Sequence, residues 1–102
     1  MKNVVDKLKL GETVTFRPRG NSMSPKIKDK EEVTVIPVKK ELNTGDVVLC
    51  KVKGRYLLHL IRSVKILKNG KKRFLICNNR GKINGWIGLN AIFGVKNNVK
   101  KE

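Results

Sequence analysis

The chain has little of several things that whole functional classes require. One histidine and two cysteines, with no second cysteine pair, give no metal-ligand spacing, and we expect neither a metal nor a cofactor. No apolar run is long enough to cross a membrane or to act as a secretory signal. The sequence therefore predicts a cytoplasmic protein with no membrane anchor.

Acidic and aromatic residues are also scarce. Eight Asp and Glu stand against 24 Lys and Arg, a formal net charge of +16 over 102 residues, and aromatics make up 5%. Such a charge attracts nucleic acid, anionic membrane surfaces or acidic proteins. However, no aromatic residues alternate with the basic ones, as they do in most single-strand binders. Nucleic acid therefore stays one candidate partner, and lysines that simply solvate the surface stay the alternative.

What the chain does have is a clear change of hydrophobic period. Val4, Val5, Leu8 and Leu10 recur at near-helical spacing and Gly11 is a suitable stop, which predicts a short helix over 2–9. Beyond it the period is two, in runs bounded by turn residues. The predicted strands lie within 12–18, 31–38, 45–52, 55–61, 63–77 and 85–95.

Two of these strand pairs are joined by strong turn signals, Lys53-Gly54 and Asn69-Gly70. Many short strands with frequent turns are typical of a small all-β barrel or sandwich. We expect one β-rich domain over 1–95, barrel-like and with the short N-terminal helix, followed by a basic tail over 96–102. Cys50 and Cys77 fall inside strands and are predicted to be reduced, buried thiols.

One loop carries small hydroxyls between two strands. It reads RGNSMSP, with Gly20 allowing a tight turn and Pro25 setting the chain direction after it. A serine there, Ser22, can expose its Oγ beside backbone amides that would stabilise an oxyanion. An ordinary turn is the alternative, because a serine nucleophile also needs a base within hydrogen-bond reach.

The only candidate for that base is His59, in the run YLLHLI. Strand alternation places Leu58 and Leu60 on one face, and it places Leu57, His59 and Ile61 on the other. A histidine among aliphatic residues is commonly structural. A compact β domain nevertheless leaves enough chain between Ser22 and His59 for them to meet.

Four short runs, in order between Phe16 and Val95, resemble the conserved boxes of the signal peptidase and LexA-type serine peptidase clan. They are GNSMSP, GDVV, LLHLI and CNN. The clan has Gly-x-Ser-Met-x-Pro with the serine as nucleophile, then Gly-Asp-Ile/Val-Val, a strand with the general base, and Gly-Asp-Asn.

Carried over by position, this resemblance implies the clan's β fold and gives roles to several residues. Ser22 becomes the nucleophile, with Asn21, Met23 and Ser24 in the oxyanion and substrate loop. His59 becomes the base, which is lysine in bacterial signal peptidases and histidine in the archaeal and endoplasmic-reticulum enzymes. The ordinary pKa of histidine is near neutrality, so histidine can act as a general base with a smaller pKa shift than lysine needs.

Two departures from the clan pattern count against activity. Asn78 replaces the aspartate of Gly-Asp-Asn, and Asn84 lies near the position where histidine-type relatives carry a further acidic residue. These two asparagines are candidates for orienting His59. An asparagine can hold an imidazole ring but cannot stabilise an imidazolium as a carboxylate does, and in the serine protease triad that exchange costs about ten-thousandfold.

Two functional interpretations therefore remain. The first is a serine endopeptidase with a Ser22–His59 dyad, acting on a peptide or protein that docks as an extended strand. The second is an inactive member that binds nucleic acid or a partner protein through its basic surface. The second would use a loop that gathers Arg80, Lys82 and Trp86. A Trp86 that merely fills the interior of the barrel is the alternative for that residue.

Overall fold

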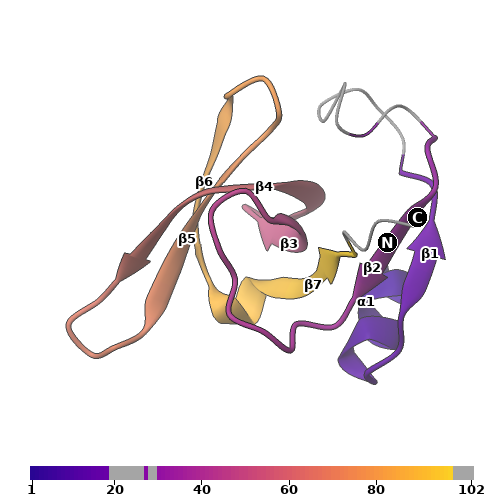
Figure 1. The fold of residues 1–102 in the computed structure, drawn as a ribbon, viewed down its shortest axis with the longest axis horizontal. Helices are drawn as coiled ribbons and strands as arrows, with labels where there is room; N and C mark the ends of the chain where they lie inside the picture. The colour runs from indigo at the N-terminus through magenta and orange to yellow at the C-terminus, as the bar shows by residue number, and fades with distance from the viewer. Residues whose placement is uncertain (19–26, 28–29, 98–102) are drawn as a thin grey trace, which may run out of the picture.

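The computed structural model describes residues 1–18, 27 and 30–97 (Figure 1). Its regular elements follow the order predicted from the periodicity. They are α1 (Lys2–Lys9), β1 (Val14–Phe16), β2 (Val33–Ile36), β3 (Val47–Val52), β4 (Arg55–Ile66), β5 (Lys72–Cys77), β6 (Ile83–Gly88), the 3₁₀ turn η1 (Leu89–Ala91) and β7 (Ile92–Lys96).

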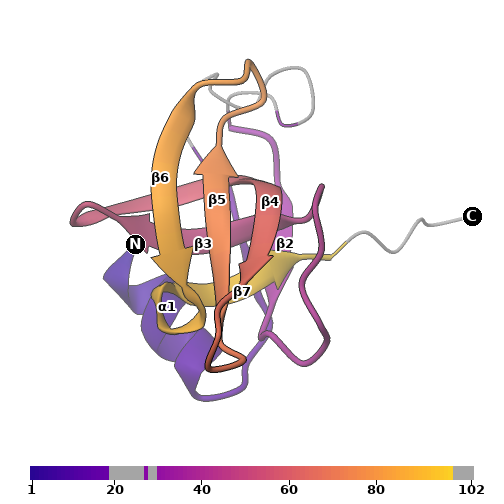
Figure 2. The same cartoon turned by 90° about the vertical axis from the view of Figure 1, so that its left-hand side faces the viewer.

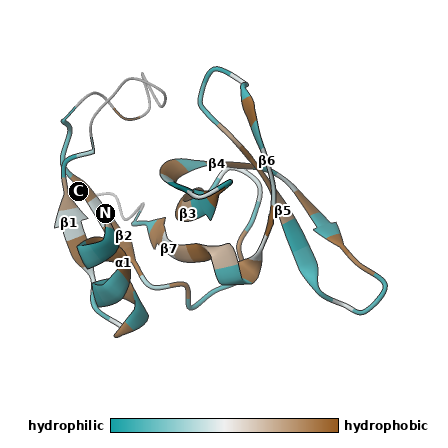
Figure 3. Cartoon of the chain, turned by 180° about the vertical axis from the view of Figure 1, so that it is seen from behind, coloured by the Kyte–Doolittle hydropathy of each residue, from teal (hydrophilic) through white to brown (hydrophobic). Residues whose placement is uncertain are grey.

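Helix α1 has the predicted bounds and packs on the sheet through one face. Val5 and Leu8 are buried on that face, and the rest of the helix is largely hydrophilic (Figure 3). The chain leaves the helix through Gly11, whose φ of +88° favours glycine and whose amide donates to the Leu8 carbonyl at 3.0 Å. Among the described residues, no helix has the length and apolar character to cross a bilayer.

The seven strands form one antiparallel sheet in the order β1-β2-β7-β3-β4-β5-β6. The last strand in sequence, β7, inserts between β2 and β3, so β2 is an interior strand of the sheet. The expected barrel is wrong in one respect, because the described sheet is open, with β1 and β6 at its two edges (Figure 1).

The sheet stays open because its middle strands have a separate core on each face. The first core joins α1, β1 and β2 to one face of the β3–β4 hairpin, and the second joins β5, β6 and β7 to the other. The first core contains Val5, Leu8, Val14, Ile27, Val33, Val35, Val47, Leu49 and Leu58. The second contains Leu42, Val48, Cys50, Val52, Ile61, Phe74, Ile76, Ile87 and Ile92.

This double burial accounts for the almost unbroken apolar run in β3, where five of six residues are buried. It also confirms the alternation predicted in β4. Leu58 lies in the first core with Leu60 packed against it, and Ile61 lies in the second core with Leu57 packed against it. Each fully buried aliphatic side chain contributes roughly 1.5–3 kcal/mol.

Both predicted hairpin turns are present. Lys53 and Gly54 have φ values of +50° and +80°, the paired positive values of a tight two-residue hairpin turn. Gly70, at φ +82°, closes the turn between β4 and β5. At the other end of the chain, β7 continues through Lys96, and the Asn97 amide donates to the Thr34 carbonyl at 2.8 Å. The sheet therefore extends beyond the predicted start of the tail.

Cys50 and Cys77 are buried and free, as predicted. Burial raises the pKa of the Cys50 thiol to about 12. Because the thiolate is the reactive form, Cys50 stays a protonated core residue at any physiological pH.

Gly94 lies too close to its neighbours to accommodate a side chain. A Cβ on this residue of β7 would lie 2.6 Å from Val35 Cγ1 and 2.8 Å from the Ile36 carbonyl oxygen. The oxygen belongs to the backbone and cannot rotate away. We expect Gly94→Ala to lower the free energy of unfolding by about 2 kcal/mol or more.

Gly88→Ala is the matched control, because its Cβ would meet only Arg73 Nη1 at an ordinary 3.5 Å. It should change stability by less than about 0.5 kcal/mol. Urea denaturation of both variants measures the difference. Equal stabilities would contradict the close packing of β7 on β2.

Candidate functional site

His59 is the one buried polar residue among the described side chains, with 7% of its surface exposed. It lies on β4 opposite Val48, on the face that carries the second core. An imidazole surrounded by aliphatic side chains needs hydrogen-bond partners, because burying an unpaired polar group costs about 1–3 kcal/mol. The fold supplies one such partner from a distant strand.

That partner is Asn84 on β6, whose Oδ1 lies 2.7 Å from His59 Nδ1. Asn84 reaches the ring because β6 contains a bulge. Ile76 pairs with Gly85 and Cys77 pairs with Ile83. Asn84 is therefore an extra residue of β6 that pairs with no residue of β5. Such a bulge turns a side chain away from the ordinary alternation. Gly85 accommodates the irregular backbone at a φ of +146°.

A second irregularity lies on the other side of β5. Ile61 pairs with Ile76 and Ser63 pairs with Leu75, which leaves Arg62 as the extra residue of β4. Strand β5 lies between β4 and β6 (Figure 2), so both register shifts occur beside the same short stretch of β5. Together they let side chains of β4 and β6 meet across an intervening strand.

The contact fixes the protonation pattern of the ring. The amide oxygen of Asn84 can only accept, so His59 Nδ1 carries the hydrogen and donates it. In the neutral ring the lone pair then belongs to Nε2. Burial lowers the pKa of His59 below its ordinary value of 6.5, and the charge of Arg55 lowers it further. The hydrogen bond that His59 donates to Asn84 raises this pKa and so opposes both effects. At neutral pH the ring is an oriented, uncharged base.

The second predicted orienting residue, Asn78, is used elsewhere. Its Oδ1 accepts from the backbone amides of Arg80 and Lys82, each at 2.9 Å. The backbone N–H of Asn78 donates to the Lys82 carbonyl, and the backbone carbonyl of Asn78 accepts from the Gly81 N–H. Asn78 therefore shapes the turn between β5 and β6, and the side chain that contacts His59 is that of Asn84.

The predicted nucleophile loop, with Asn21, Ser22, Met23 and Ser24, lies outside the described residues. The residues that flank it are described. The Lys30 amide donates to the Pro18 carbonyl at 2.8 Å, which ties the two ends of the connection together.

The third predicted group, Arg80, Lys82 and Trp86, is on the surface. Arg80 and Lys82 are exposed in the turn between β5 and β6. Trp86 is 40% exposed, and the Lys65 ammonium lies 4.7 Å from the centre of its ring. Trp86 pairs with Leu75 on the sheet face opposite to the second core, so the idea that it fills the interior is wrong.

The two bulges and the part played by Gly85 were not among the features predicted from the sequence. The available signal was the Asn84-Gly85 dipeptide inside an otherwise strand-like run, since an isolated glycine in a strand often marks a bulge. Comparison of the chain with protein-family models and with curated proteins gives no significant match. The chemistry of the site therefore rests on its own residues.

The buried position of His59 makes a titration prediction. Because the chain has one histidine, its imidazole resonances are unambiguous, and NMR titration should give a pKa below 6.5. The unfolded chain then binds the proton more readily than the folded one. The free energy of unfolding should therefore be level above about pH 6.5 and should fall as the pH drops below it.

Asn84→Asp tests the cause. A carboxylate beside Nδ1 favours the imidazolium, so the pKa of His59 should rise above that of the natural chain. Asn90→Asp makes the same charge change on the exposed η1 turn and should leave the titration nearly unchanged. A His59 pKa that does not respond to Asn84→Asp would contradict the hydrogen bond.

Proposed function

We propose that this protein is a serine peptidase of the signal peptidase and LexA type, with Ser22 as nucleophile and His59 as general base. The observation that carries the proposal is the 2.7 Å contact between His59 Nδ1 and Asn84 Oδ1. A general base of this kind needs a third group that selects its tautomer and fixes its ring. Asn84 does both for His59, and the clan-like order of sequence boxes supplies the serine.

The proposed reaction is acyl transfer to water in two steps. Ser22 Oγ attacks the scissile carbonyl carbon and passes its proton to His59 Nε2, and backbone amides of the serine loop hold the oxyanion. His59 then protonates the leaving amine as the C–N bond breaks, which leaves an acyl-enzyme. His59 then takes a proton from water as that water attacks the ester carbon. As the acyl C–O bond breaks, His59 passes the proton to Ser22 Oγ and the carboxylic acid product leaves.

An asparagine in the orienting position predicts a slow enzyme. Asn84 keeps the ring neutral and aligned, but it gives the imidazolium formed during attack no compensating negative charge. Burial opposes that charge as well, as the lowered pKa of His59 indicates. We expect weak peptidase activity that an added carboxylate would increase.

Peptide-library cleavage across pH 4–9 tests the proposal. Activity should rise as His59 loses its proton, with the acid limb below about pH 6.5, and should be abolished by Ser22→Ala and by His59→Ala. Asn84→Asp should shift the acid limb to higher pH and raise the rate tenfold or more, while Asn90→Asp should do neither. Cleavage that survives both Ser22→Ala and His59→Ala would belong to a contaminant and would refute the assignment.

Nucleic-acid binding is a second candidate function, favoured by one surface observation. Trp86 is exposed on the sheet with Lys65 against its ring, and Arg80 and Lys82 occupy the turn that leads into the same strand. An accessible indole beside cations can stack on a base while the cations contact phosphates. This function would need neither Ser22 nor His59.

Titration of labelled single-stranded DNA and RNA at about 50 and 200 mM salt tests this candidate. Trp86→Ala should weaken binding by about tenfold, in line with the loss of one stacked base. Lys2→Ala on α1 removes a charge far along the chain from this surface and should have little effect. Equal losses in both variants would indicate diffuse attraction to the net charge, with no site at Trp86.

A further inference from the structure

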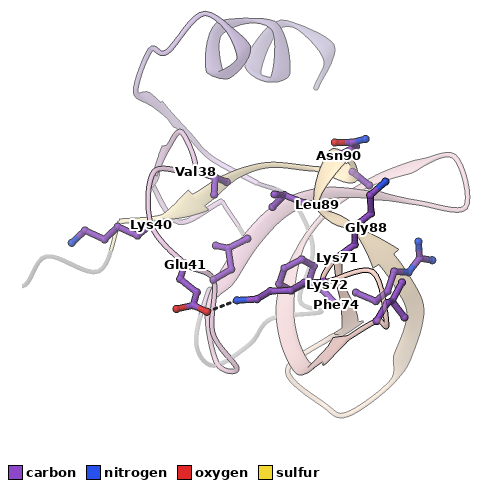
Figure 4. A pocket seen from close by; sticks show the side chains of 14 residues that line it. Val38, Lys40, Glu41, Lys71, Lys72, Phe74, Gly88, Leu89 and Asn90 are labelled. Carbon is purple, nitrogen blue, oxygen red and sulfur yellow. Dashed lines mark hydrogen bonds and ion pairs between the residues drawn. The ribbon is translucent and has the colours of Figure 1, made fainter.

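A hollow on the molecule lies where three chain connections meet, and His59 is not among the residues that line it. It has a volume of about 850 Å³ and is bounded by the β2–β3 connection, the turn between β4 and β5, and the link from β6 through η1 (Figure 4). No part of the proposed peptidase chemistry uses it. We call it the hairpin groove.

The floor of the hairpin groove is apolar and firmly held. Phe74 lies at its centre (Figure 4) and is 2% exposed, while Leu42 is 6% exposed. Val38 and Ala91 complete the floor, and all of these residues belong to the second core or pack against it. A floor anchored in the core keeps its shape when the groove is empty.

Large apolar side chains also stand exposed at the rim. Leu67 is 37% exposed and Leu89 is 53% exposed, and both line the groove, Leu67 from the turn between β4 and β5 and Leu89 from η1. Ile66, 68% exposed, pairs with Lys72 in the sheet and so faces the same side as that lining residue. Exposed aliphatic residues gathered around a hollow are typical of surfaces that bind another protein.

The charges at the rim are unequal. Among the described residues that line the groove, four are cationic, Lys40, Lys71, Lys72 and Arg73, and one, Glu41, carries a carboxylate. Glu41 pairs with Lys72 (Figure 4), and that hydrogen bond and charge lower the pKa of the carboxyl. The pair neutralises Lys72 and leaves three cations that no carboxylate in the described part of the chain contacts.

We propose that the hairpin groove binds an acidic peptide segment of a partner protein, with one or two bulky apolar side chains seated against Leu67 and Leu89. Aliphatic walls over an apolar floor fit such side chains, and the excess of cations at the rim complements flanking Asp and Glu. The proposal is independent of the peptidase function. It places the partner at the end of β6 remote from Asn84.

The same residues disfavour nucleic acid as the occupant. Of the described residues that line the groove, Phe74 alone is aromatic, and its ring is too deeply buried to stack on a base. Leu67 and Leu89 offer no hydrogen bonds to a base edge. Cations around an aliphatic hollow match a peptide that carries both charge and apolar bulk.

Fluorescence anisotropy with three labelled peptides tests the proposal on the full chain. The first peptide has a Leu-Leu-Phe centre between runs of Glu and Asp, the second replaces those acids by Gln and Asn, and the third replaces the centre by alanines. The first should bind, and each of the others should bind at least tenfold more weakly. Equal binding of the first and third would overturn the proposal, because charge alone would then suffice.

Variants locate the site. Arg73→Gln should weaken binding of the first peptide about threefold, and Leu89→Ser about tenfold. Glu41→Gln should tighten binding, because it removes the carboxylate that pairs with Lys72 and leaves the Lys72 charge available to the peptide. Lys2→Gln makes the same charge change as Arg73→Gln on α1 and should stay within twofold of the natural chain. Urea denaturation verifies that each variant is folded.

Two results would overturn the assignment. One is a loss on Lys2→Gln equal to that on Arg73→Gln, which would mean diffuse attraction to the whole chain. The other is displacement of the first peptide by a single-stranded oligonucleotide that also shifts the NMR amide signals of Leu67 and Leu89. That result would mean that the groove binds nucleic acid.

Discussion

The burial of the β3–β4 hairpin on both faces is the constraint on which the rest of this structure depends. Helix α1 and strands β1 and β2 cover one face, and strands β5 and β6 cover the other. Both cores contain residues of β3 and β4, so the two cores share these strands. The shared hairpin separates the edges β1 and β6, so the sheet curls without closing.

A polar residue on such a hairpin must be satisfied from within the protein, and this requirement explains the site. His59 faces the second core, and water cannot serve Nδ1 there as it would on a one-sided sheet. The bulge at Asn84 brings an amide oxygen to it. The hydrogen bond that satisfies the buried ring also selects the tautomer of the proposed general base, so one interaction serves both the structure and the proposed chemistry.

The excess of positive charge lies outside both cores, and the kind of partner that it would attract depends on the neighbouring side chains. At Trp86, Lys65 lies against an exposed ring, which suits a base or another flat group. Around the hairpin groove the cations border aliphatic side chains over a buried Phe74, which suits an acidic peptide. Net charge alone attracts both kinds of partner, and the neighbouring side chains distinguish them.

The sequence by itself determined the elements that depend on near neighbours. The helix over 2–9, the turns at Lys53-Gly54 and Asn69-Gly70, and the face on which His59 lies follow from local spacing and backbone preference. Only the tertiary structure decided that β7 inserts between β2 and β3, that the sheet stays open, and that Asn84 rather than Asn78 contacts His59. Strand order and register shifts arise from packing between segments far apart in the chain, which no local pattern records.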